Sequence, residues 1–458
     1  MHDTLIDLTT NHKSFTSLQE VTLRNFSFHV IGTIVLSVLV VCIALGGGYQ
    51  LNEQGARAVG MGGAFVARAS DPSAIYFNPA GLAFQSGINV LGGVNFILPS
   101  TKFKDLAGVE TDTKSQVFTP VNLYGTYQLN DQLVVGLGIF NPFGLGTEWP
   151  EPWAGDQFAV KSTVTTWYFN PTVGFKINDQ LSVGAGVSYI YGKVTMGYRV
   201  PTYAMVISPV PGAPYLVPVP TTVTEGNVNL DASATGFGFN VGVIYKPVDK
   251  LSLGVSFRSE TKLDFSGTAT FTNMQALTPY FPGGDGKATL PMPMNIYVGA
   301  AYDVMSNLTL EADFQYVGWS DYKELAVNIP NGPNFPFPPT YGGSHPLQKA
   351  GAPLVKNWND GYLLRGGAEY KMDSQVTLRG GLILDLTPQP PSKAEPMLPD
   401  GDRVDICLGG SYKISDNFYV DASYMLVLFM ETNAKSSELP GTYNSNAHII
   451  SVNLGYSF

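Results

Sequence analysis

Residues that could carry acid–base, nucleophilic or metal chemistry are scarce in this sequence. Three of its five histidines fall within the first 46 residues, one lies in a long loop and one begins the final strand-like run: His2, His12, His29, His345 and His448. Acyl-transfer chemistry needs a nucleophile beside a general base, and no Gly-x-Ser-x-Gly elbow or Ser/His/acid set is present. Phosphate loops and clusters with metal-ligand spacing are missing as well. We therefore expect no enzyme activity, no cofactor and no metal.

One short segment, PDGDR (399–403), places two acids beside a base. Asp400, Asp402 and Arg403 could coordinate a divalent ion or a lipopolysaccharide head group. An internal salt bridge or an Asx turn is the commoner fate of such a group, and we prefer that interpretation.

The elements that would position any site begin after a targeting segment. Lys13 and Arg24 precede an apolar run over 30–45, which is short for a membrane helix of about 20 residues. Small residues at Ala44-Leu45-Gly46 suit a cleavage site. We predict a signal peptide over 1–46, cut after Gly46; an uncleaved anchor is the alternative, because the polar lead-in is unusually long.

The composition of the chain argues against an ordinary soluble domain and against a nucleic-acid-binding protein. Only 14% of the 458 residues are charged, whereas soluble domains carry about 25%. The formal charge of −10 argues against a nucleic-acid partner, which would need clustered Lys and Arg. With Cys42 inside the predicted signal, Cys407 is the mature chain's only thiol, so no intramolecular disulfide can form.

A short polar turn recurs between alternating segments. Asn, Asp and Ser favour such turns because their side chains bond the local backbone. Six of these turns predict six hairpins, and the runs 88–98 and 448–458 bring the total to fourteen strands. Long Gly- and Pro-rich stretches such as 200–227 and 329–357 lie between the hairpins. Short turns at one end and long loops at the other are typical of outer-membrane barrels. The turns are LNDQL (129–133), INDQL (177–181), PVDKL (247–251), VMSNL (304–308), MDSQV (372–376) and ISDNF (414–418).

The faces of the strands indicate the solvent on each side. In the final strand one face carries large apolar groups and the other carries small or polar ones, which suits lipid outside and a polar lumen. A soluble sandwich also alternates, but the signal, the low charge and the even strand count favour an all-β, 14-stranded antiparallel transmembrane β-barrel in the bacterial outer membrane. The apolar face is Ile450, Val452, Leu454, Tyr456 and Phe458.

A barrel of this width needs something inside it. Eight strands leave an interior that side chains can fill, and wider barrels hold a channel or a plug. The segment 47–87 precedes the first strand and is rich in Gly, Ala and apolar residues. We predict that it forms an N-terminal plug, or hatch, and that 88–458 forms the barrel. The stretch DPSAIYFNPAGLA (71–83), with Asn78, Pro79 and Ala80, then lies within the lumen.

At this segment the chain resembles a known family. The run GGYQLNEQGARAVGMGGAFVARASDPSAIYFNPAGLA is similar to the N-terminal hatch of the FadL/TodX outer-membrane transporters, and the resemblance continues through NPFGLGTEW, LPMPMNIYVGAAYDV, LEADFQYVGWSDYKEL and LPDGDR to the last strand. It covers essentially the whole mature chain. The resemblance implies a plugged fourteen-stranded barrel that takes up long-chain fatty acids or aromatic hydrocarbons.

The resemblance also implies a lateral exit through an inward kink of the third strand. The matching positions are Asn141, Pro142, Phe143 and Gly144. Proline lacks the N–H that a strand ladder needs, so pairing should break at Pro142 on at least one side. The alternative is a strand that simply ends there.

For a fatty acid, the resemblance implies a basic partner for the carboxylate inside the barrel. Arg199 matches approximately, Lys193 is the fallback, and Lys356 matches a second position. Because a slip of one residue turns a strand side chain to the other face, solvated loop charges are the alternative for all three.

Two long loops, 201–220 and 329–347, are apolar for exposed segments. Exposed apolar patches usually mark binding surfaces, although the two loops could instead pack on each other. The expected groove residues are Tyr203, Met205, Ile207, Tyr215, Leu216, Phe335 and Phe337.

These observations, with the resemblance, predict passive uptake of hydrophobic small molecules, with long-chain fatty acids favoured, through rearrangement of the plug and lateral exit at the kinked third strand. A porin for polar solutes would need rings of charge, for which the chain has few residues. An aromatic or alkane hydrocarbon channel is the alternative within this class, and a surface binding or adhesion barrel without transport is the alternative of another class. We expect contacts with outer-membrane lipid and lipopolysaccharide, recognition of the C-terminal strand by the barrel-assembly machinery, and a monomer.

Overall fold

The computed structural model describes residues 47–458 except 208–215, 275–277, 279–282, 329–353 and 435–436. For 200–207 and 216–225 it describes the backbone and not the side chains. The predicted signal peptide lies outside the described residues. Among the residues described, no helix is long and apolar enough to span a membrane.

Antiparallel strands form one closed sheet, in which the first long strand pairs with the last. The long strands are β1 (Ile88–Asp105), β3 (Val121–Gln128), β4 (Leu133–Phe140), β6 (Lys161–Lys176), β7 (Leu181–Ile207), β8 (Leu216–Val248), β9 (Leu251–Arg258), β10 (Thr261–Thr272), β11 (Gly284–Met292), β12 (Asn295–Met305), β13 (Leu308–Val317), β17 (Gly361–Lys371), β18 (Val376–Leu386), β19 (Arg403–Lys413), β20 (Phe418–Phe429) and β22 (Gly441–Ser457). Shorter pieces are β2 (Glu110–Asp112), β5 (Gly144–Glu148), β14 (Glu324–Leu325), β15 (Val327–Asn328), β16 (Leu354–Val355) and β21 (Thr432–Asn433).

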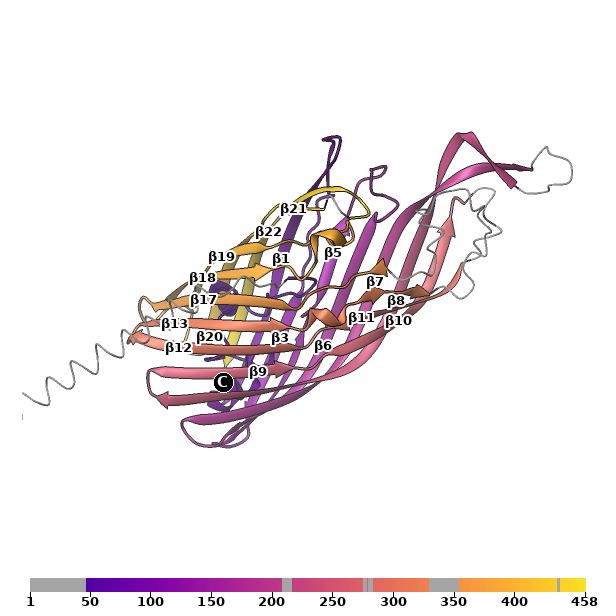
Figure 1. Ribbon diagram of the computed structural model, residues 1–458. Coiled ribbons are helices and arrows are strands. Elements are labelled where there is room, and N and C mark those ends of the chain that lie inside the picture. Colours follow the sequence, from indigo (N-terminus) through magenta and orange to yellow (C-terminus); the bar gives the residue numbers. More distant parts are fainter. Residues whose placement is uncertain (1–46, 208–215, 275–277, 279–282, 329–353, 435–436) are drawn as a thin grey trace, which may run out of the picture. The chain divides into compact units, whose positions relative to one another are not determined.

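The predicted count of fourteen strands is confirmed. β9 and β10 both pair with β8 and form one interrupted strand. β11 pairs with β10 and β12 pairs with β9, so β11 and β12 also form one interrupted strand. β4 and β5 both pair with β6 and form a third. Counting each interrupted strand once gives a closed 14-stranded antiparallel barrel. The β7–β8 hairpin extends beyond the other strands (Figure 1).

All six predicted turns join neighbouring strands. At Asn130 the side-chain Oδ1 accepts hydrogen bonds from the backbone N–H groups of Gln132 and Leu133, at 2.9 and 3.0 Å. Asn178 and Asp373 make the same pair of bonds in their own turns. This local chemistry explains why the turns could be predicted from sequence.

The outer face of the barrel is apolar, as the alternation predicts. In β22, Ile450 and Leu454 are 46% and 51% exposed, whereas Ser451 and Asn453 are buried. With no water in the bilayer core, a closed barrel pairs every strand edge, and its outward side chains must be apolar.

Residues 47–87 pack against the inward faces of the strands. They contain two short α-helices, α2 (Ala56–Gly60) and α3 (Ala74–Phe77), and the 3-10 helix η1 (Pro79–Phe84). Helix α2 contacts β18, β19, β20 and β22, whereas η1 contacts β4, β6, β7 and β8. Two further 3-10 helices of the described residues, η3 (Trp319–Asp321) and η5 (Pro391–Lys393), belong to loops. We call residues 47–87 the hatch.

Small residues on the lumen side admit the hatch. A Cβ at Gly381 would lie 2.2 Å from the backbone nitrogen of Gly62, and a Cβ at Gly254 would lie 2.3 Å from the carbonyl oxygen of Val66. Real Cβ contacts are not that short, so a side chain at either position would clash. The backbone of the hatch reaches the barrel wall because both positions are glycine.

Buried carboxylates of the barrel hold the middle of the hatch. Asp313 Oδ2 accepts hydrogen bonds from the N–H groups of Phe65 and Val66, at 2.8 and 3.0 Å. Arg68 forms ion pairs with Glu311 and Glu369, at 3.0 and 2.9 Å. Polar groups buried this deeply must be partnered, so these contacts fix the position of the hatch in the barrel.

Candidate functional site

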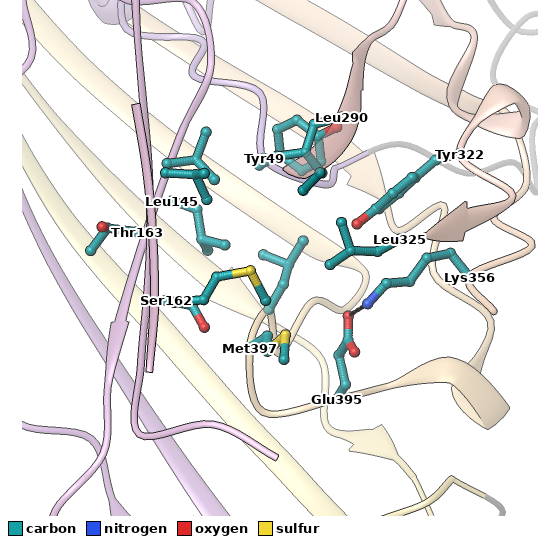
Figure 2. Close-up of a pocket in the computed structure, with 15 residues that line it drawn as sticks. Tyr49, Leu145, Ser162, Thr163, Leu290, Tyr322, Leu325, Lys356, Glu395 and Met397 are labelled. Atoms are coloured by element: carbon teal, nitrogen blue, oxygen red, sulfur yellow. Dashed lines mark hydrogen bonds and ion pairs between the residues drawn. The ribbon is translucent and has the colours of Figure 1, made fainter. Parts of the chain in front are cut away.

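A pocket lies between the barrel wall, the hatch and two loops. Its empty volume is ≈ 530 Å³, including space open to solvent. Apolar side chains make up most of its lining (Figure 2). The lining residues are Tyr49, Leu145, Ser162, Thr163, Val164, Val194, Met196, Ala288, Leu290, Tyr322, Leu325, Lys356, Glu395, Met397 and Leu398.

Lys356 is the one cation among the described residues that line the pocket. Its side chain is 3% exposed, and its Nζ forms an ion pair with Glu395 Oε1 (Figure 2). The ammonium also lies 5.8 Å from the centroid of the Tyr322 ring. Two short strands position it: β14 and β16 pair, and the N–H of Lys356 donates to the carbonyl of Lys323 at 2.8 Å. The pocket therefore combines an apolar wall with one ion pair.

Tyr49 connects the pocket to the hatch. Its ring packs edge-on against Trp319, at 4.6 Å between centroids, and against Tyr322 and Phe143, at 6.1 Å each. Its hydroxyl donates a hydrogen bond to the carbonyl of Pro291. Burial raises the pKa of the Tyr49 and Tyr322 phenols well above the usual value, so both remain neutral.

The third strand breaks where the proline predicts. β4 pairs with both β3 and β6 up to Phe140, whereas β5 pairs with β6 and with no other named strand among the described residues. The side chain of Asn141 crosses the break: its Oδ1 accepts from the N–H of Val121 at 3.0 Å, and its Nδ2 donates to the carbonyl of Thr166 at 2.6 Å. The strand thus resumes after the break instead of ending there.

The hatch occupies the edge that this break leaves open. The N–H of Leu51 donates to the carbonyl of Pro142, and the N–H of Gly144 donates to the carbonyl of Tyr49, both at 2.9 Å. Gln50 lies opposite Phe143 in an antiparallel bridge. Residues 49–51, which we call the hatch strand, therefore form a short β-ladder with the kink, and Tyr49 touches both the pocket and the kink.

The Asn-Pro-Ala motif ties the far end of the hatch to the barrel. Asn78 is fully buried, and its Nδ2 donates to the carbonyls of Val66 and Val243, at 2.9 and 3.1 Å. Its Oδ1 accepts from the N–H of Ala80 at 3.1 Å and caps η1, in which Pro79 is the first residue. The motif anchors η1 against β8.

The structure separates the three basic candidates. Lys356 lines the pocket. Lys193 is exposed on the outer face, because its neighbour Val194 points into the pocket and adjacent strand residues alternate. Arg199 lies 3.7 Å from both Glu151 and Asp156 and is not part of the pocket lining.

The predicted loop groove falls largely outside what the structure describes. Tyr215, Phe335 and Phe337 lie outside the described residues. For the other four positions only the backbone is described, in β7 and β8, and the groove stays a prediction: Tyr203, Met205, Ile207 and Leu216.

The acids of PDGDR make internal contacts. Asp400 Oδ2 accepts from the N–H of Gly48 at 2.8 Å and from the hydroxyl of Thr387 at 2.6 Å, and Asp402 caps the N–H of Thr387. Arg403 pairs with Asp385. Burial raises the pKa of Asp400 to about 6. Within the described part of the chain, no group of three or more His, Cys, Asp or Glu side chains is placed to hold a metal ion.

Two buried or half-buried charged residues, Glu395 and Arg258, were not predicted from the sequence. Glu395 stands in an ordinary loop sequence, SKAEPM, and only the fold brings it to Lys356. Arg258 is buried, with its guanidinium 5.0 and 5.4 Å from the ring centroids of Tyr76 and Phe140. Its one described hydrogen bond donates to the carbonyl of Tyr76 at 3.1 Å. Arg258 stands at the end of a strand, and nothing in the local sequence indicates its burial.

Comparison with known proteins places this geometry among outer-membrane transport proteins. A family described as "Outer membrane protein transport protein (OMPP1/FadL/TodX)" matches residues 37–458. The chain is 26% identical to the "Long-chain fatty acid transport protein" of Escherichia coli O6:H1, over 85% of this chain and 90% of that protein.

Two solved structures share the fold. A Pseudomonas aeruginosa FadL homologue superposes with a TM-score of 0.74 at 22% identity, covering 90% of this chain and 100% of the homologue. The P. putida toluene transporter TodX gives a TM-score of 0.66 at 18% identity, covering 91% and 99%.

Proposed function

Because the chain belongs to the OMPP1/FadL/TodX family of outer membrane transport proteins, we propose that it carries long-chain fatty acids inward through the pocket beside Lys356. Its location in the bacterial outer membrane and its transport of hydrophobic compounds follow from the family. The cargo and the route are our proposal.

The observation that carries the proposal is the pocket itself, an apolar cavity with one buried ammonium at its side. An acyl chain gains about 0.8 kcal/mol for each CH₂ that leaves water, and the carboxylate needs a cationic partner once it is desolvated. Lys356 supplies that partner. The curated relative named for long-chain fatty acids supports the same cargo.

The proposed exit runs sideways through the kink. The kink is covered by the hatch strand, through one hydrogen bond to Pro142 and one to Gly144 at the start of β5, and Tyr49 of that strand also lines the pocket. A displacement of residues 49–51 would therefore open the pocket and the kink together. The cargo would then pass into the bilayer without crossing a water-filled pore.

Aromatic hydrocarbons are the second candidate cargo. Lys356 is already paired with Glu395, so a neutral ligand could occupy the apolar space beside the Tyr49 and Tyr322 rings without breaking any polar contact. The fold is shared with a toluene transporter, although 18% identity speaks for the fold alone.

Uptake by cells that lack their own fatty-acid channel tests the proposal. We expect labelled oleate to enter cells that express this protein, and entry to fall at least fivefold with Lys356→Met. Lys193→Met is the matched control, because it removes the same charge from the outer face and should leave uptake unchanged. Entry of toluene alone would favour the hydrocarbon channel. Entry of neither, with a folded barrel in the membrane, would favour a binding barrel without transport.

A further inference from the structure

We propose that Glu395 determines which head group the pocket accepts. Its carboxylate occupies the position on Lys356 that the carboxylate of a fatty acid would take. A fatty acid then binds by exchanging with Glu395, whereas an uncharged amphiphile of the same length binds beside an intact ion pair. The inference rests on the proposed function of this pocket and adds a residue that selects among its cargoes.

The charges in the pocket favour such an exchange. The lining holds one cation, Lys356, and one carboxylate, Glu395, in direct contact. A second carboxylate would leave two negative groups facing one ammonium in an apolar cavity. Two carboxylates that face each other in an apolar cavity repel strongly when water is excluded, which favours departure of one of them.

The surroundings of the two partners decide which group moves. Lys356 is 3% exposed at the side chain, and its backbone is fixed by the bond to Lys323. The Glu395 side chain is 22% exposed and follows η5, and its own backbone is joined to the described residues by an isolated bridge to Leu398. Glu395 can therefore turn outward and be rehydrated, while Lys356 stays and receives the incoming carboxylate.

Tyr322 completes the head-group position. Its ring lies against Lys356, and in Figure 2 its hydroxyl is directed toward the pocket. Burial and the nearby Tyr49 and Glu395 groups raise the pKa of this phenol, so the hydroxyl remains a neutral donor. A hydroxyl or a carboxylate head group could accept a hydrogen bond from it in either state of Glu395.

Removing the resident carboxylate should therefore change affinity for one ligand class only. In Glu395→Gln, Lys356 has lost its partner, and a fatty acid restores an ion pair without displacing one. We expect oleate to bind at least tenfold more tightly, which corresponds to about 1.4 kcal/mol. Oleyl alcohol has the same chain and no charge, and its affinity should change by less than twofold.

The experiment is equilibrium binding of tritiated oleate and tritiated oleyl alcohol to the full-length protein in amphipol, with protein-free amphipol as background. Glu324→Gln is the matched control, because this glutamate is exposed beside the pocket residue Leu325 and should change neither affinity. Lys356→Met should weaken oleate at least tenfold and spare oleyl alcohol. Glu395→Asp, which shortens the side chain by one methylene, should give a smaller gain for oleate and serves if the glutamine variant does not fold.

The binding measurements distinguish failure of the inference from failure of the proposed function. An unchanged oleate affinity in Glu395→Gln, or equal shifts for both ligands, would overturn the role of Glu395 while leaving the pocket as a cargo site. If neither ligand binds the unaltered protein, both the inference and the proposed function fail. A gain for oleate alone supports both.

Discussion

Locking the hatch strand to the kink should stop transport if residues 49–51 cover the exit. Gln50 and Phe143 oppose each other in an antiparallel bridge, a geometry that places Cα atoms about 4.5–5.5 Å apart and within reach of a disulfide. We expect the pair Gln50→Cys and Phe143→Cys to cross-link on oxidation. Cys407 is buried and should not interfere.

The expected magnitude follows from the contacts that opening must break. Two backbone hydrogen bonds join the hatch strand to the kink, and three side-chain hydrogen bonds tie Tyr49 and Gln50 to Pro291, Tyr297 and Gln315. Each of the five has a net value of about 0.5–1.5 kcal/mol. Withdrawing the buried Tyr49 ring adds about 1.5–3 kcal/mol. The sum, about 4–10 kcal/mol, places the open state at roughly 10⁻³ of molecules or fewer. A covalent bond removes that fraction.

The assay is oleate uptake with the oxidised and reduced forms of the same double variant. We expect oxidation to lower uptake to the level of cells without the protein and a reductant to restore it. Each single-cysteine variant should be insensitive to oxidation. Full uptake by a preparation that is completely cross-linked would refute the idea that cargo leaves beneath the hatch strand.

Three further perturbations probe other parts of the design. Asn78→Ala removes three hydrogen bonds that anchor η1, so oleate flux should change by severalfold. The barrel should stay resistant to unfolding by detergent at room temperature. Unchanged flux would count against Asn78 as an anchor of η1. Pro142→Val restores a backbone N–H at the kink and should reduce oleate uptake, and wild-type uptake would argue against a lateral exit through this break. Asp400→Asn should stabilise the fold by up to about 3 kcal/mol above pH 6, because burial raises the pKa of this carboxyl from 3.8 to about 6. Between about pH 4 and pH 6 the folded protein keeps a proton that the unfolded chain has lost, so the contribution of Asp400 to stability falls as the pH rises through this window. Urea midpoints measured against pH should show that fall in the unaltered protein and not in the asparagine variant.

The barrel was predictable because its signals are local. Three of the turns carry an Asn or Asp cap and a fourth carries a Ser cap, and each strand shows its two faces in a period of two. The break at Pro142 was predictable for the same reason, since the missing N–H is a property of that residue alone. Recognition of the C-terminal strand by the assembly machinery, the monomeric state and the cleavage after Gly46 stay predictions.

The site was harder to predict because it depends on contacts between distant residues. Lys356 meets Glu395 only through the packing of two loops, and Tyr49 reaches the kink only through the fold of the hatch. The faces of Lys193 and Arg199 depend on register, and a single step along β7 separates Lys193 from the pocket residue Val194. Composition and alternation carry no information on such pairings.

The anchoring of the hatch also dictates an order of assembly. Its partners Asp313, Glu311 and Asn453 lie 244 to 397 residues farther along the chain. The hatch precedes every strand in the chain and therefore cannot complete its docking until the last strand is in place. Docking of the hatch is then the final step of biogenesis, and it seals only those barrels that have been completed.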